Sequence, residues 1–396
     1  MSTTVSASIS ATAPAADATL LDTLARHTAL ETFAIESELA FFEAPKGERI
    51  AGYAVVTVSR SSIAIRFASD TPMSVAKAGY GEANGRIGAV SGAWVAPRVN
   101  DAGSTAAGDR LFGTQELVVK AGADAEIAAT RLVFAGAAWQ GSQQGAELLD
   151  GRRAFVAPLS KETVNHHEAR MAVAIEGDLD ETTIEAVDRA SSFIAGLDLE
   201  MLRIDSFSAQ GRLIRAKHLR GFRRVGRGPH SPFTGTADEH RMRAWAALAT
   251  AIPRLEKDGV PIITMINHIA SHNQVAEIQA SAPLLLLATE TMAYYRMHGR
   301  ELGEGAASRR QELARLSREL DLGLNDEDLD RFEKLRVELL DAGFFHKPGY
   351  ETGRPQKDIK FLRDIAHMVV FRLCGYDGPF YGAETFTLRN IAAQKK

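Results

Sequence analysis

The stretch "ERIAGYAVVTVSRSSIAIRFAS", residues 48–69, decides the fold class of the first half of the chain. Apolar and polar residues alternate on both sides of the turn "SRSS", which is the pattern of a β-hairpin with one buried face. Similar short segments, separated by Gly-rich turns, follow at 86–97, 114–122 and 130–141. Regular short strands of this kind predict a β-sandwich or an open barrel.

The apolar period becomes helical in the second half of the chain. A single helix at 181–196 and a hairpin over 199–219 come first. The sequence then predicts helices at 239–256, 261–278, 281–298, 306–320, 326–341 and 357–374. Strands followed by helices predict an α+β protein of several domains, with a β-sandwich-like domain before a helical bundle.

Composition changes mark the predicted domain boundaries. A Ser/Thr/Ala-rich leader is expected to be disordered, and a Gly/Pro/Arg-rich stretch is expected to connect the two halves. The predicted parts are the leader (1–28), the β-rich domain (29–210), a basic hairpin and linker (211–235), the helical domain (236–386) and a tail (387–396).

Composition also limits the protein class. A net charge of −4 shows no global attraction to nucleic acid or to an anionic membrane. The single cysteine, Cys374, excludes an internal disulfide framework and a cysteine-rich metal site. The leader lacks a positive start and an apolar core, and the apolar run at 282–288 is too short to cross a bilayer. We therefore expect a cytoplasmic protein without a membrane partner.

The segment "NDEDLDRFEKLRVELLDAG", residues 325–343, has a charge in an unusual place. Arg336 lies within the apolar stripe formed by Phe332 and Leu340, and a charge that faces a core requires a partner. One interpretation is an arginine whose stem packs while its head reaches a carboxylate. Asp341 is also unusual, because the dipole at a helix C-terminus disfavours an anion.

The helical half resembles HEPN domains, and more narrowly those of ApeA-type abortive-infection proteins. The similarity rests on "SAPLLLLATETMAYY" (281–295), on the Arg-bearing helix, and on a last helix that closes in "FRLCGYDGPFYG" (371–382). The front half is similar only in architecture, because such proteins place a β-sandwich-like domain before the helical one.

The resemblance implies a composite, metal-free RNA-cleaving cleft between two paired copies, built on an R-N-x-x-x-H motif. Only the arginine carries over, as Arg336; Val337 stands at the Asn position and Asp341 at the His position. An acidic residue of an early helix often supports that arginine in the family, and Glu290 is the candidate here. The resemblance implies a homodimer and no cofactor or metal.

The chemistry explains why the loss of the histidine matters. Cleavage requires one group that takes a proton from the 2′-hydroxyl and one that returns a proton to the leaving oxygen. Histidine can do either near neutral pH, whereas an ionised aspartate only accepts. We therefore expect a catalytically impaired relative. The weaker alternative is an active RNase with a relocated histidine, which would be His346 or His367. His367 follows Arg363 by four residues, and the other interpretation of these two residues is a solvated helix face.

The stretch 211–228 gathers basic residues without any acid. Such a segment can hold a phosphate backbone, or it can be a solvated hairpin that packs on acidic surface. The candidate RNA-binding residues are Arg212, Arg215, Lys217, Arg220, Arg223, Arg224 and Arg227.

His268 and His272 lie one turn apart on a predicted helix, a spacing that can seat zinc. No third ligand accompanies them, so polar helix packing is the preferred interpretation and no metal is predicted. The resemblance as a whole suggests a phage-defence protein that senses or binds RNA. The alternative from another class is an assembly protein that binds a protein partner through the β-domain and dimerises through the bundle.

Overall fold

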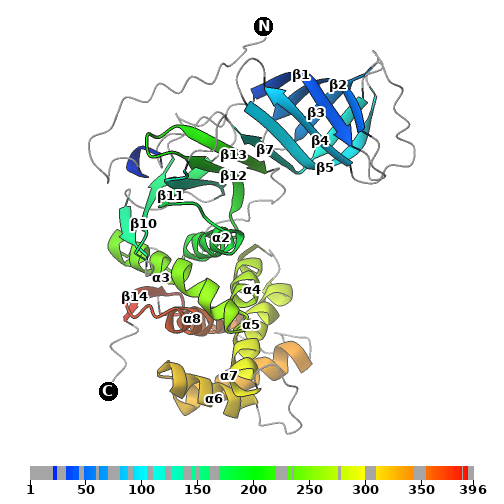
Figure 1. Ribbon diagram of the computed structural model, residues 1–396. Coiled ribbons are helices and arrows are strands. Elements are labelled where there is room, and N and C mark those ends of the chain that lie inside the picture. Colours follow the sequence, from blue (N-terminus) through cyan, green and yellow to red (C-terminus); the bar gives the residue numbers. More distant parts are fainter. Residues whose placement is uncertain are drawn as a thin grey trace. The chain divides into compact units, whose positions relative to one another are not determined.

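The computed structural model divides the chain into two units, each described by itself (Figure 1). The first unit contains residues 1–139, 154–178 and 200–223, and the second contains 140–153, 179–199 and 224–396. The structure describes residues 21–24, 33–43, 49–58, 62–69, 81–87, 92–104, 110–120, 126–136, 144–148, 151–159, 169–219, 231–233, 236–274, 278–298, 309–341, 354–385 and 387–390.

A closed six-stranded barrel begins the first unit, where a sandwich or open barrel was expected. Hydrogen bonds join its strands in the order β4-β1-β2-β3-β6-β5, and β5 pairs again with β4 to close the ring. The strands are β1 (Phe33–Glu43), β2 (Arg49–Val58), β3 (Ile63–Ala68), β4 (Gly81–Ile87), β5 (Gly92–Ser104) and β6 (Arg110–Thr114). The predicted hairpin is confirmed as β2–β3, with Val58 opposite Ile63.

Alternating residues of these strands fill the barrel. Val56, Ile65 and Phe112 are among the side chains of one buried cluster, which also contains Trp94. Gly85 has no side chain because there is no room for one: a Cβ there would lie 2.6 Å from the indole nitrogen of Trp94. The small residue allows a strand to pass close to the largest side chain of this core.

The same antiparallel sheet continues beyond the barrel within the first unit, because β5 also pairs with β7. The further strands follow the order β7-β13-β12-β8-β11-β10. They are β7 (Glu116–Lys120), β8 (Ala129–Ala135), β10 (Arg153–Pro158), β11 (Ala169–Glu176), β12 (Glu200–Phe207) and β13 (Leu213–Leu219). The predicted hairpin over 199–219 is confirmed as β12–β13, so residues 213–219 belong to a sheet and not to a linker.

A buried ion-pair network ties this sheet together. Asp205 on β12 lies directly opposite Arg131 on β8. Arg131 donates to its Oδ2 from Nε at 3.1 Å and from Nη2 at 2.5 Å, while Arg203 Nε donates to Oδ1 at 2.5 Å. Both oxygens of the buried carboxylate are thus satisfied, as a charge away from water requires.

The predicted disordered leader, 1–28, is wrong at residues 21–24. These four residues are helical, and Leu21 and Leu24 are buried against Ala129, Ala174 and their neighbours. The Leu24 carbonyl accepts a hydrogen bond of 2.9 Å from Arg131 Nη1. Two leucines three residues apart lie on one helix face, which is why a short segment of low overall hydrophobicity still packs.

The second unit is helical. The helices are α2 (Glu181–Ala195), α3 (Asp238–Lys257), α4 (Ile262–Gln274), α5 (Ile278–His298), α6 (Arg309–Leu320), α7 (Asp326–Arg336), the π-helical turn η2 (Val337–Asp341) and α8 (Arg354–Leu373). All seven predicted helices are confirmed, with shifted ends. Gly196, Gly259, Gly323 and Gly375 follow helix ends with positive φ, a conformation that glycine adopts without strain.

Two features of the second unit differ from the predicted boundaries. The short strand β9 (Gln144–Glu147) and helix α2 belong to it, although both precede residue 236. The predicted tail, 387–396, is wrong over 387–390, because β15 (Thr387–Asn390) pairs with β14 (Pro379–Gly382) as a terminal hairpin.

Aromatic side chains form the centre of this unit around α8. The Phe371 ring lies 5.4 Å from Phe193 of α2, 5.1 Å from Tyr376 and 5.5 Å from Phe380. The indole N–H of Trp245 on α3 donates to Ser191 Oγ of α2 at 3.1 Å. Helix α2 is therefore part of the helical core.

Candidate functional site

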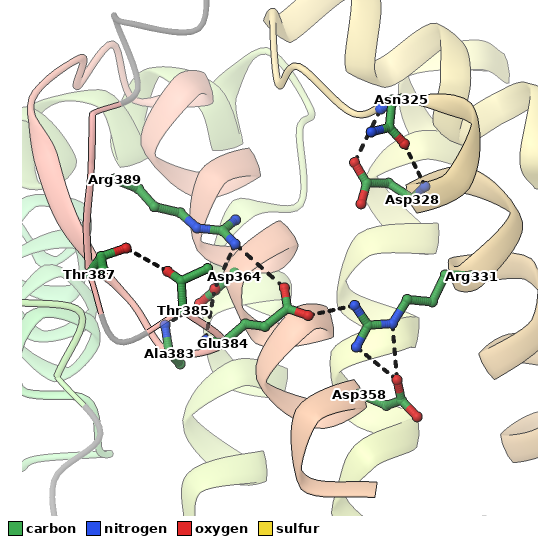
Figure 2. Close-up of polar contacts among 10 residues, drawn as sticks. All are labelled: Asn325, Asp328, Arg331, Asp358, Asp364, Ala383, Glu384, Thr385, Thr387 and Arg389. Atoms are coloured by element: carbon green, nitrogen blue, oxygen red, sulfur yellow. Dashed lines mark hydrogen bonds and ion pairs between the residues drawn. The ribbon is translucent and has the colours of Figure 1, made fainter. Parts of the chain in front are cut away.

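Helix α7 carries the candidate arginine, and its start is fixed by reciprocal capping. The Asp328 N–H donates to Asn325 Oδ1 at 2.9 Å, and the Asn325 N–H donates to Asp328 Oδ2 at 3.2 Å (Figure 2). This capping box satisfies two backbone donors that the first turn leaves free. The Asn325–Asp328 pair thus sets where α7 begins.

Arg331, in the middle of α7, joins three elements. Its Nε and Nη2 donate to Asp358 Oδ1 of α8 at 3.0 and 2.8 Å, and its Nη1 donates to Glu384 Oε1 at 2.5 Å (Figure 2). The guanidinium carbon lies 4.2 Å from the centre of the Phe361 ring. A planar guanidinium held by two carboxylates and an aromatic face fixes the orientation of α7.

The Asp364 carboxylate fixes the terminal hairpin on α8. It accepts the Ala383 N–H at 2.8 Å and the Glu384 N–H at 3.2 Å, and Arg389 Nη2 lies 3.6 Å away (Figure 2). Burial raises the pKa of this fully buried acid, against the effect of those donors. The hairpin and Arg331 together form a clasp of five charged residues: Arg331, Asp358, Asp364, Glu384 and Arg389.

Arg336 lies at the end of the helix that this clasp orients. Its Nε is 2.8 Å from Glu290 Oε1 of α5, with 22% of the arginine side chain and 13% of the glutamate side chain exposed. The predicted pairing of Arg336 with Glu290 is confirmed. The charge on the apolar face is thus half-buried, paired, and still open to solvent.

The surroundings of Glu290 are strongly polar. Burial raises its pKa, while the nearby Arg336 and Arg309 lower it, and burial is the larger effect. Arg309 of α6 donates to the buried Glu312 at 2.7 Å and lies 5.3 Å from the centre of the Tyr294 ring. Helices α5, α6 and α7 therefore meet through paired charges.

The π-helical turn changes the geometry expected around position 341. The sequence predicted a regular α-helix through residue 341, but residues 337–341 are π-helical. A π-helix bonds residue i to i+5, so the backbone of residue 341 lies about one turn beyond Arg336. Residue 336, the last of α7, is thus followed directly by this turn, in which Val337 is 45% exposed.

The structure describes only one of the two histidines that were considered as a relocated catalytic group. His346 lies outside the described residues. His367 is buried in α8, with its ring 5.3 Å from that of Phe193 in an edge-on contact. Arg363 is buried too, so the interpretation of these two residues as a solvated helix face is wrong. Their shared face is directed into the bundle.

Three of the seven candidate RNA-binding residues are described. Arg215 Nη2 lies 3.1 Å from Asp178 Oδ1, and Lys217 Nζ lies 3.0 Å from Glu116 Oε1. Arg212 is exposed. Arg220, Arg223, Arg224 and Arg227 lie outside the described residues. Two of the three described cations thus pair with acids of the same unit.

The histidine pair of α4 is partly buried. Burial lowers the pKa of His268, and His272 is buried. Among the described residues, no group of three or more His, Cys, Asp or Glu side chains is placed to hold a metal ion. The arrangement is that of polar residues packed between helices.

Comparison with known proteins adds no relative. No family model, curated protein or solved structure matches this chain. Within the described part, the chain contains no helix with the length and apolar character needed to cross a membrane.

Sequence reasoning missed the clasp. Its members come from α7, α8 and the terminal hairpin, and no local pattern joins them. The one signal was the run of acids and arginines with amphipathic spacing in "DRFEKLR", 330–336, which showed two arginines on α7 but not their partners.

Removing Arg336 should destabilise the protein more than removing the charge of Glu290. At pH 7, Arg336→Ala should lower the free energy of unfolding by about 2 kcal/mol, because it removes the cation paired with a largely buried carboxylate. Glu290→Gln should cost less than about 1 kcal/mol, since it removes a charge that burial already disfavours. The double variant should recover part of the loss in a denaturant-unfolding cycle.

The same variants predict a pH dependence. Because the folded-state pKa of Glu290 is raised, its contribution is present below the unfolded value and is lost as pH rises through the folded value. Arg336→Ala should raise that pKa further and enlarge the loss as pH rises above the unfolded-state value. Arg315→Ala, which removes an exposed pair with Glu319, is the matched control and should change little. A larger cost for Glu290→Gln than for Arg336→Ala would contradict the assignment.

Proposed function

We propose that this protein binds or senses RNA without cutting it, as a catalytically impaired HEPN-like protein of the phage-defence type. The observation that supports this most is Arg336, whose side chain is 22% exposed, which pairs with Glu290 and which directly precedes a π-helical turn. A guanidinium that reaches solvent can bind phosphate oxygens through charge-assisted hydrogen bonds.

Two of the three motif positions carry residues that cannot support cleavage. Val337 and Asp341 replace the amide and imidazole of the family motif. Aspartate at pH 7 accepts a proton but has none to return to a leaving oxygen. Its charge also repels phosphate, by up to about 4 kcal/mol at 4 Å with an effective dielectric of 20. We therefore expect weak RNA contact and no chemistry at this site.

A cleavage assay in EDTA tests the proposal. The unmodified protein should leave a labelled single-stranded RNA intact while it retards that RNA in a binding assay at low salt. Arg336→Ala should weaken the binding. Asp341→His with Val337→Asn should give slow, metal-independent cleavage, because the imidazole can both accept and return a proton.

The outcomes separate the open alternatives. Rapid cleavage by the unmodified protein, lost in His346→Ala or His367→Ala, would establish the relocated-histidine RNase instead. Since His367 is enclosed by aromatic rings, the structure favours that alternative less than the sequence did. Absence of RNA binding at low salt would remove the RNA proposal, and the basic residues of 211–228 would then have only structural partners.

An assembly role is the second candidate function. Leu287 on α5 and Val337 are 39% and 45% exposed, and they stand beside Glu290 and Arg336 respectively. Exposed large apolar side chains next to a polar pair are typical of an interface. We propose a homodimer through this face, with the β-rich unit free to bind a protein partner. Sedimentation of Val337→Asp should then show monomer where the unmodified protein shows dimer.

A further inference from the structure

Three arginines in the described part of the chain are almost completely buried: Arg241 at 4% exposure, Arg131 at 5% and Arg363 at 8%. Arg131 is held by Asp205 and by the Leu24 carbonyl. Arg241 donates to Asp238 at 3.0 Å and to the Phe233 carbonyl at 3.1 Å. Arg131 and Arg241 therefore follow the rule that a buried charge is paired.

Arg363 departs from that rule. No hydrogen bond or ion pair with another described residue holds its guanidinium, and burial lowers its pKa. The adjacent Asp364 favours the charge through space, but both oxygens of that carboxylate accept backbone N–H groups of the terminal hairpin. Figure 2 shows Asp364 directed to that hairpin. A buried cation left in this state costs several kcal/mol unless an anion joins it.

The α8 face around Arg363 contains basic residues and no acid. Lys360 lies three residues before it and His367 four residues after it, so the three share one face of α8. The other positions on this face, Ile359, Ala366 and Val370, are apolar. Lys360 is only partly buried, which leaves this end of the face in contact with solvent.

We propose that Arg363 anchors a binding site for a phosphate group, with Lys360 at its solvent edge. A guanidinium binds two phosphate oxygens in a fixed fork, and a second cation suits a dianion better than a single carboxylate. The ligand class is a phosphate monoester or diester, whether it comes as free phosphate, as a nucleotide or as the end of an RNA strand. The site is separate from Arg336, and it does not depend on the proposed RNA function.

Thermal unfolding of the full chain tests the site. Sodium phosphate should raise the melting temperature in a saturable way, relative to sodium chloride at equal ionic strength, because a ligand that binds only the folded state stabilises it. A 5′-mononucleotide and a short 5′-phosphorylated RNA form the other arms. The probe that saturates at the lowest concentration identifies the source of the phosphate.

Two variants make the test specific. Arg363→Met should abolish the saturable shift, and without phosphate it should melt at or above the unmodified protein, because it removes an unpaired buried charge. Arg315→Met, at an exposed arginine of α6, should keep the full shift. Arg363→Gln serves as a second variant of the same kind if the methionine variant does not fold.

Three results would overturn the proposal. The first is the lack of a saturable shift in the unmodified protein with all three probes, and the second is an equal shift in Arg363→Met. The third is strong destabilisation of both Arg363 variants in phosphate-free buffer, which would show that a protein group already pairs with the arginine. Because Arg336→Ala should leave this shift unchanged, failure here and failure of RNA binding at Arg336 are distinguishable.

Discussion

Arg131→Ala is expected to lower the free energy of unfolding of the first unit by about 3–5 kcal/mol. The substitution leaves the fully buried Asp205 with only one of its two cations, and it frees the Leu24 carbonyl. Removing one member of a buried pair costs this much because the remaining charge stays away from water. Denaturant unfolding followed by a probe of the β-rich unit measures the loss.

The control for Arg131 is a solvent-exposed pair. Arg110 Nη1 lies 3.4 Å from Asp101 Oδ2 in the barrel, with about a third of each side chain exposed. Arg110→Ala should therefore cost no more than about 1 kcal/mol. Equal losses in the two variants would contradict the assignment of Arg131 as the support of this sheet.

The same network predicts acid sensitivity. Burial alone would raise the pKa of Asp205, but Arg203 and Arg131 together lower it below its ordinary value. The stability it contributes is therefore complete above the unfolded-state pKa, about 3.9, and is lost as pH falls through the lower folded value. Arg131→Ala should move that loss to higher pH, because one of the two cations that hold the carboxylate ionised is gone.

Local patterns made much of the fold predictable. The hairpins β2–β3 and β12–β13 combine period-2 alternation with a polar turn, and both are present. Closure of the barrel was not predictable in this way. It depends on pairs such as Ala40 with Gly85, which join segments far apart in the chain and leave no local signal.

The candidate site was predictable to a similar extent. Arg336 could be predicted because a charge interrupts an apolar stripe, and Glu290 was named through the family resemblance. The π-helical turn could not be predicted from the sequence, because the same residues can form α-helical i→i+4 or π-helical i→i+5 hydrogen bonds. His367 shows the same limit: its spacing from Arg363 gave a shared face, but only the packing of Phe193 showed that the face is buried.

Phe371→Ala is expected to be the most damaging substitution in the helical unit, at about 3–5 kcal/mol. The ring is fully buried and contacts aromatic side chains from four separate segments: Phe193, Phe233, Tyr376 and Phe380. Deleting it removes apolar surface from the core and leaves a cavity that rigid neighbouring rings cannot fill. Loss of the helical far-UV signal at lower denaturant concentration, with an unchanged m-value, would measure this effect.

The matched control is Leu388→Ala on β15. This side chain is exposed, so its loss should change the free energy of unfolding by no more than about 0.5 kcal/mol.

The aromatic core around Phe371 also predicts the stability of a fragment that contains only part of the helical unit. A chain that starts at residue 236 lacks Phe193 and also Ser191, the acceptor for the Trp245 indole. Such a fragment should unfold at lower denaturant than the same unit in the full chain, and by an amount comparable to Phe371→Ala. If fragment and full chain instead unfold together, α2 contributes little to this core, and the large loss expected for Phe371→Ala must then come from α8 and its hairpin alone.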